Sequence, residues 1–210
     1  MIIVTTPMCK QIVEWAGLNE FKVNKHPDKE EGDLAILLSE SKVEMDSLTL
    51  KLNTFNQIKE SILKVSKHCF AHDLTDKEIS NEDIDEIFSS YDLEFANDED
   101  AFENLRKENS NKVVKVYSEF LKDIVLDIGA KIGEDNYSFV VYPDYLKEKV
   151  YENECGEDSS ISFIEIPSHT KVSKDPIERT EERYSILVNG LKEWNLHLNK
   201  KILNNKKYTI

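Results

Sequence analysis

Apolar runs and stretches of helical spacing alternate along the chain from its first residues. Residues 2–4 form a short β-rich apolar run, and residues 12–16 then place apolar side chains on one face of a helix. Pro7 suits the first turn of that helix and Gly17 suits its end. The pattern predicts a buried strand, a polar turn and a helix at the start of the chain.

The same alternation continues through the rest of the sequence. Further strands are predicted at residues 21–25, 33–38, 48–52, 137–142 and 161–166. Strands that alternate with helices favour an α/β fold with parallel pairing. We expect two small parallel-sheet lobes joined by helices, or else one three-layer α/β/α sheet.

Three long helices are expected beside these strands. Thr54, or Asn53 before it, caps the first, with Gln57 placed as in a capping box. Residues 112–128 show the strongest helical spacing and would form a helix that crosses a sheet or joins two lobes. Pro176 opens the last helix.

Acidic residues concentrate in one segment. Residues 73–108 contain fourteen acidic and three basic residues, and so carry −11 of the formal net charge of −14. This segment has short helical patterns separated by polar stretches. We therefore expect an N-terminal α/β lobe over residues 1–70, an acidic helical connector over residues 71–110, and a C-terminal α/β lobe with long helices over residues 111–210.

The first part of the chain also carries a series of short motifs. These are a strand with a Thr-x-Pro turn, a helix ending in Ala-Gly-Leu, an Asp-Leu-Ala-Ile strand ending in Ser-Glu, and the run Leu-x-Leu-Asn-Thr-Phe-x-x-Ile-x-x-Ser-Ile. With them, residues 1–67 resemble the N-terminal lobe of the helical-backbone metal receptors, which bind cobalamin, haem or ferric siderophores and have a chelatase-like lobe. The chain departs from that family in its short length, its lack of a signal sequence and its acidic insertion. The resemblance implies a two-lobed architecture that binds a ligand.

Charge and composition indicate which partners and which location to expect for this protein. The acidic charge argues against nucleic acid as a partner, and no apolar stretch is long enough to span a membrane. Cys9, Cys69 and Cys155 form no CxxC pair, so we expect no structural disulfide and a cytoplasmic location.

Metal and nucleotide motifs are weak in this sequence. The glycines form no phosphate-binding loop, and residues 92–103 lack the turn glycine of a calcium loop. His68 and His72 would share a helix face, as zinc ligands can, but histidines near a helix end are also favoured by the terminal carbonyls. We expect no metal site, and the sequence identifies no cofactor.

The expected site lies where strands end. In open α/β sheets, ligands bind beyond the carboxyl ends of the strands, so the ends near Val4, Leu38, Val141 and Ile166 are expected to open on one cleft. The start of the last helix should lie within reach. The candidate ligand-binding residues at these places are Thr5, Thr6, Cys9, Ser39, Glu40, His169, Arg179 and Arg183.

Three of these candidates have alternative interpretations. Cys9 near a helix start could have a thiol of lowered pKa and act as a nucleophile, or it could be a buried, inert cysteine. Arg179 and Arg183 could bind a carboxylate or phosphate with their planar forks. They could instead form ion pairs along the helix with the neighbouring glutamates.

These observations favour a cytoplasmic protein that binds a small molecule, either an anion or a metal-bearing cofactor, in a cleft between strand ends. An enzyme of cofactor metabolism could use the same cleft, with Cys9 or His169 as acid, base or nucleophile. A third possibility is an interaction module whose acidic segment docks a basic protein partner.

The acidic segment generates a prediction about dynamics. Residues 73–109 should exchange their amide protons faster than the rest of the chain, because few apolar side chains hold them and like charges repel. Hydrogen exchange measures this directly. Protection equal to that of residues 113–128 would contradict the prediction.

Overall fold

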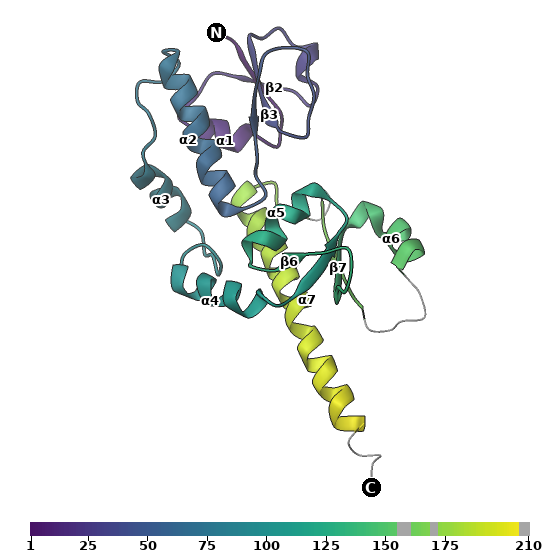
Figure 1. Cartoon of the computed structure of the whole chain (residues 1–210). Coiled ribbons are helices and arrows are strands. Elements are labelled where there is room, and N and C mark those ends of the chain that lie inside the picture. The colour runs from purple at the N-terminus through teal and green to yellow at the C-terminus, as the bar shows by residue number, and fades with distance from the viewer. Residues whose placement is uncertain (155–160, 169–171, 206–210) are drawn as a thin grey trace. The chain divides into compact units, whose positions relative to one another are not determined.

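A computed structural model describes residues 1–154, 161–168 and 172–205, with side chains as far as Lys192. The chain forms two four-stranded parallel sheets with helices packed on them (Figure 1). It divides into two compact units: unit 1 is Met1–Asn97 with Ser173–Thr180, and unit 2 is Asp98–Val172 with Glu181–Ile210. The predicted α/β fold is confirmed, in its two-lobed form.

The sheet of unit 1 has the strand order β2-β1-β3-β4. Its strands are β1 (Ile3–Thr5), β2 (Lys22–Val23), β3 (Leu34–Leu38) and β4 (Ser47–Leu50). Val4 of β1 pairs with Lys22 on one side and with Ala35 on the other, all in parallel. The central strands β1 and β3 are buried, whereas β2 is exposed at the edge. Continuous apolar runs such as residues 34–38 are typical of strands covered on both faces.

Four helical segments complete unit 1: α1 (Lys10–Trp15), the 3-10 turn η1 (Pro27–Lys29), α2 (Phe55–Ala71) and α3 (Asn81–Ser89). Helices α1 and α2 pack against each other. Thr54 caps α2 as predicted, because its hydroxyl accepts the Gln57 N–H at 3.2 Å. The Gln57 amide oxygen in turn accepts the N–H of Asn53, one residue before the cap, at 3.1 Å.

The sheet of unit 2 repeats this strand order as β6-β5-β7-β8. Its parallel strands are β5 (Val113–Val116), β6 (Lys131–Ile132), β7 (Phe139–Pro143) and β8 (Ser162–Ile166). Its helices are α4 (Glu99–Asn109), α5 (Glu119–Asp127), η2 (Asp144–Leu146), α6 (Lys147–Glu154) and α7 (Pro176–Asn205), of which α7 begins in unit 1. Helix α7 approaches β8 at Gly190, where a Cβ would lie 2.7 Å from the Ile164 side chain.

The single helix predicted at residues 112–128 is wrong. The structure has β5 followed by the shorter helix α5 in this range. Val114 and Val116 are buried within a strand that pairs on both sides with β6 and β7. The β-branched valines suit a strand, and their spacing happens to continue the apolar face of α5.

The segment predicted as an acidic connector, residues 71–110, is divided between the units. Helix α3 belongs to unit 1, where Ile84 and Phe88 are buried, and α4 belongs to unit 2, where Leu105 is buried. Each acidic helix therefore has a narrow apolar face that packs on its own unit.

Helices α1 and α5 end in the same way. Gly17 (φ 89°) and Gly129 (φ 85°) occupy the left-handed region just after these helices. In α1, the N–H of Leu18 reaches the carbonyl of Val13; in α5, the N–H of Ala130 reaches that of Val125. Each is a Schellman end, which a glycine allows without strain and which turns the chain back toward the next strand.

A partly buried ion pair attaches α6 to the sheet of unit 2. The Glu154 carboxylate lies 2.7 Å from the Lys115 ammonium and also accepts the hydroxyls of Tyr117 and Tyr137. Burial raises the pKa of Glu154, but its three hydrogen-bond donors lower it more, so that it lies below its ordinary value. The carboxylate is therefore more stable as an anion in the folded protein than in the unfolded chain.

We predict that Glu154→Gln lowers the free energy of unfolding by about 2–4 kcal/mol at pH 7, because the Lys115 ammonium loses its carboxylate partner at 2.7 Å and keeps only the more distant Glu134, at 3.9 Å. A lowered carboxyl pKa stabilises the fold above the unfolded value of about 4.3 and loses this effect as the pH falls through the folded value. The difference between wild type and variant in urea unfolding should therefore shrink toward pH 3. The exposed neighbour Glu152→Gln is the control, and an equal effect of the two variants would contradict the prediction.

Candidate functional site

The carboxyl edge of the unit 1 sheet holds most of the predicted site residues. Thr5 ends β1, and its buried hydroxyl donates to the Ile36 carbonyl at 2.9 Å. Ser39 directly follows β3 and donates its N–H to the Leu50 carbonyl at 2.9 Å. The Thr5 hydroxyl thus joins β1 to β3, while Ser39 is exposed at this edge.

Cys9 is the N-cap residue of α1 and is fully buried. Burial raises the pKa of its thiol to about 11, although a hydrogen bond with Thr6 and the charge of Arg179 act in the opposite direction. The Glu40 charge raises this pKa further. The lowered pKa considered for Cys9 is therefore wrong, because α1 is short and burial outweighs the effect of its dipole. The alternative of a buried, inert cysteine fits the structure.

These electrostatic effects also show which groups lie together. Thr6 contacts Cys9 directly, since its carbonyl accepts the Cys9 N–H at 3.0 Å. Glu40 and Arg179 lie close enough for their charges to act on the same thiol. Thr6, Cys9, Glu40 and Arg179 therefore lie near one another in unit 1.

The two arginines belong to different units. Arg179 is 2 % exposed and donates to the carbonyl of Lys174 at 3.2 Å. Arg183 is 5 % exposed, donates to the carbonyls of Pro167 and Ser168, and stacks over the Phe120 ring at 4.9 Å. Both guanidinium groups thus bind loop backbone. His169 lies outside the described residues.

The strand ends belong to two sheets. Val4 and Leu38 lie in the sheet of unit 1, whereas Val141 and Ile166 lie in that of unit 2. Within each sheet the parallel pairing brings the two ends to a common edge. The single cleft expected for all four ends stays a prediction.

A hollow of about 340 Å³ opens at the carboxyl edge beside Ser39. It lies between the ends of β3 and β4 and one face of α2, and is lined by Ser39, Thr49, Leu50, Lys51, Gln57, Glu60, Ser61 and Lys64. Sequence reasoning found Ser39 and missed the others. The α2 residues repeat at three- and four-residue spacing, but such a polar face on a helix is normally solvated, so the spacing alone does not indicate a site.

Two hydrogen bonds shape this hollow. The Lys64 ammonium donates to the Thr49 carbonyl at 2.7 Å, and the Ser61 hydroxyl donates to the Lys51 carbonyl at 2.9 Å. Both join α2 to β4 and the residue after it. The walls of the hollow are therefore held at a defined separation.

The histidine pair lies near the end of α2. The His68 and His72 rings are 4.3 Å apart, and His72 Nδ1 lies 2.8 Å from the His68 carbonyl oxygen. Burial and the neighbouring His72 lower the pKa of His68. Across residues 1–154, 161–168 and 172–192, no three His, Cys, Asp or Glu side chains are grouped to hold a metal ion. Within the same parts of the chain, no helix has the length and apolar character to cross a bilayer.

Comparison with known proteins finds similarity to solved structures alone. No family model matches the chain, and no curated protein matches it. Among solved structures, it is similar to the laminin binding protein Lmb of Streptococcus agalactiae, described as a bifunctional protein with adhesin and metal transporting activity. The sequence identity is 9 % and the TM-score 0.49, over 90 % of this chain and 98 % of that chain.

The burial of Cys9 generates a prediction about its reactivity. At pH 7.5, iodoacetamide should leave Cys9 unmodified in the folded protein and modify it in urea, because only the thiolate reacts. A rise in pKa from 9.0 to about 11 alone lowers the thiolate fraction about 100-fold. Peptide mass mapping separates Cys9 from the other cysteines. Rapid modification of Cys9 in the folded protein at neutral pH would contradict this.

Proposed function

We propose that this protein binds a small anionic molecule at the carboxyl edge of the unit 1 sheet, in the hollow beside Ser39. The observation that carries the proposal is the hollow itself, which has a volume of about 340 Å³ where β3 and β4 end. Its size is within the range of pockets that hold small ligands, and its position is where open α/β sheets usually bind them.

The lining favours an anion. Its ammonium groups are those of Lys51 and Lys64, and Glu60 provides the opposing carboxylate. This local excess of positive charge stands out in a chain whose net charge is −14. Ammonium groups bind carboxylates and phosphates through charge-assisted hydrogen bonds. A metal-bearing cofactor with acidic side groups would also belong to this class of ligand.

Neutral polar groups would position the rest of the ligand. The hydroxyls of Ser39 and Thr49 and the amide of Gln57 line the same hollow. Because α2 and β4 are already joined by hydrogen bonds, the ligand would meet a largely formed site and order few side chains on binding.

The other predicted residues of unit 1 have neighbouring roles in this proposal. Glu40 directly follows Ser39, and its carboxylate would repel an anion at that end of the hollow. Thr6 and Arg179 would support the neighbouring Cys9, on whose thiol they act. Thr5 and Cys9 are buried and would support the edge from beneath. His169 and Arg183 stay predicted ligand residues of unit 2. Docking of a basic partner on the acidic helices also stays a prediction.

We further propose a cytoplasmic location. Among the described residues, the supporting feature is that Cys9 and Cys69 are both free thiols, which a reducing compartment preserves.

The test is a titration with inorganic phosphate and with citrate, followed by the amide resonances of Ser39, Thr49 and Lys64. Lys64→Gln should weaken binding about tenfold, since a charged hydrogen bond contributes about 1.5 kcal/mol or more. Lys67→Gln is the matched control, because Lys67 is an exposed lysine of the same helix outside the hollow.

Two outcomes would overturn the proposal. One is that neither anion shifts these resonances at millimolar concentration. The other is that Lys64→Gln and Lys67→Gln weaken binding equally, which would indicate general attraction to the lysines of α2 rather than a site.

A further inference from the structure

Strand β8 lies at one end of the unit 2 sheet. In the order β6-β5-β7-β8 it pairs with β7 on one side and with no described strand on the other. The Ser162 N–H donates to the Ser138 carbonyl at 3.0 Å, toward β7. Because successive residues of a strand direct their backbone groups to alternate sides, the N–H and C=O groups of Phe163 and Glu165 point away from β7. We call these groups the lateral edge of β8.

The lateral edge of β8 has no partner within the part of the chain that the structure describes. No backbone or side-chain group there forms a hydrogen bond with the outward N–H or C=O groups of Phe163 and Glu165. An unpaired strand edge is a row of donors and acceptors with which another strand can pair.

The other end strands are short or covered at their lateral edges. Strands β2 and β6 have two residues each, whereas β8 has five. At β4, the Thr49 carbonyl accepts the Lys64 ammonium and the Lys51 carbonyl accepts the Ser61 hydroxyl, so that α2 covers this edge. Short edge strands and covering helices are means by which proteins prevent strand pairing. The open edge of β8 is therefore an exception within this fold.

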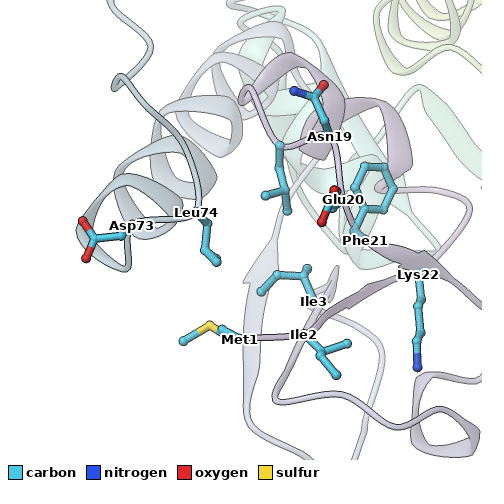
Figure 2. Close-up of a pocket in the computed structure, with 10 residues that line it drawn as sticks. Met1, Ile2, Ile3, Asn19, Glu20, Phe21, Lys22, Asp73 and Leu74 are labelled. Carbon is cyan, nitrogen blue, oxygen red and sulfur yellow. The ribbon is translucent and has the colours of Figure 1, made fainter.

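Strand β2 also borders a hollow of about 730 Å³ at the amino edge of the unit 1 sheet, lined by residues 1–3, 18–22, 73 and 74 (Figure 2). The Lys22 side chain extends from β2 away from Phe21, and its ammonium donates to the Glu31 carbonyl at 2.9 Å. A lysine on so short an edge strand disfavours the addition of another strand. The edge of β2 thus lacks the features of the β8 edge.

The sequence of β8 favours strand pairing. Residues 161–166 contain three isoleucines and one phenylalanine, with no glycine or proline. Six-residue segments of high β-propensity and low net charge pair readily with other strands when they are exposed. Pro167 follows directly and, lacking an N–H, limits the pairing to this segment.

An aromatic pair borders the lateral edge on one face of the sheet. Phe163 is half-buried and stacks on Tyr151 of α6, with ring centroids 5.0 Å apart, and Tyr151 is 41 % exposed. The inner side of Phe163 packs against Val140, Tyr142 and Val150. An added strand would place one side chain beside this aromatic pair, because opposite residues of paired strands share a face. Aromatic and β-branched side chains pack well in such pairs.

Charge distinguishes between possible partners. The Glu165 carboxylate is paired with the Lys147 ammonium at 2.8 Å, so the strand itself selects by backbone hydrogen bonds and apolar contact. The whole chain, however, has a formal net charge of −14 and would repel a second copy or an acidic segment.

From these features we propose that the lateral edge of β8 binds an extended, basic segment of a partner protein by strand addition. Backbone hydrogen bonds to Phe163 and Glu165 would hold the segment, and a β-branched or aromatic side chain would lie beside Phe163. This surface belongs to unit 2 and lies outside the acidic residues 73–108. It is therefore separate from the anion site proposed in unit 1 and from docking on the acidic helices.

Amide exchange of the full chain at pH 7 gives the first test. In dilute protein, the amide protons of Phe163 and Glu165 should exchange about tenfold faster, or more, than those of Ile164 and Ile166, which face β7. Equal protection of all four would mean that the chain itself covers the edge, and would overturn the proposal.

A synthetic peptide, acetyl-Lys-Val-Thr-Val-Thr-Val-Lys-amide, is the probe for the partner segment. At millimolar concentration it should slow the exchange of the Phe163 and Glu165 amides. The same peptide N-methylated at its valines keeps the side chains and loses N–H donors, so it should bind about tenfold more weakly. A version with glutamates in place of the lysines should also bind more weakly, because the chain is acidic.

Two variants of Glu165 separate the backbone from the side chain. Glu165→Pro removes the outward N–H, leaves the bonds of Ile164 and Ile166 to β7, and should weaken peptide binding about fivefold. The matched control Glu165→Thr removes the same carboxylate but keeps the N–H, and should bind like the wild type. The N-methylated peptide tests the same hydrogen bonds in the wild-type chain, whether or not Glu165→Pro folds.

Three further outcomes would overturn the proposal. The first is that the lysine peptide leaves the Phe163 and Glu165 amides unchanged. The second is that the N-methylated or the glutamate peptide binds as tightly as the lysine peptide. The third is that both amides become protected as the protein concentration rises, together with dimer formation in sedimentation, which would make a second copy of this chain the occupant.

Discussion

Parallel pairing of the described strands is the constraint on which both units of this protein depend. A parallel neighbour requires a connection that returns along the sheet, so strand ends gather at one edge and strand starts at the other. In unit 1 this places Ser39 at one edge and Leu18 at the other. The two hollows, of about 340 Å³ and 730 Å³, lie at these opposite edges.

The two units have sheets of the same strand order but are built from different residues. Helix α1 of unit 1 and helix α5 of unit 2 each end at a glycine with a φ between 85° and 89°. At Gly129 the backbone of Arg106 is so close that a Cβ would lie 2.4 Å from its carbonyl oxygen. No repeat is visible in the sequence, because a buried strand needs only apolar residues and the turn needs only a glycine. The similarity is therefore one of topology.

Buried charges in this protein serve mainly to hold segments together. Asp175 accepts the N–H groups of Ile177 and Glu178 at the start of α7, and also binds Gln11 and Tyr91 at 2.6 and 2.7 Å. It thereby joins the start of α7 to the rest of unit 1. Each bond replaces water around this partly buried carboxylate, whose removal from water would otherwise be unfavourable.

The sequence by itself determined the fold class, the strands at residues 33–38 and 161–166, the Thr54 cap and the start of α7, because these follow from local apolar spacing and end signals. Tertiary structure alone decided that residues 113–116 pair as β5, since strand pairing depends on partners far along the chain. It also decided which side chains are buried. The sequence places Cys9 near the start of the first helix, but the raised pKa of its thiol comes from the residues packed around it after folding. The lining of both hollows likewise depends on helix and strand faces that meet only after folding.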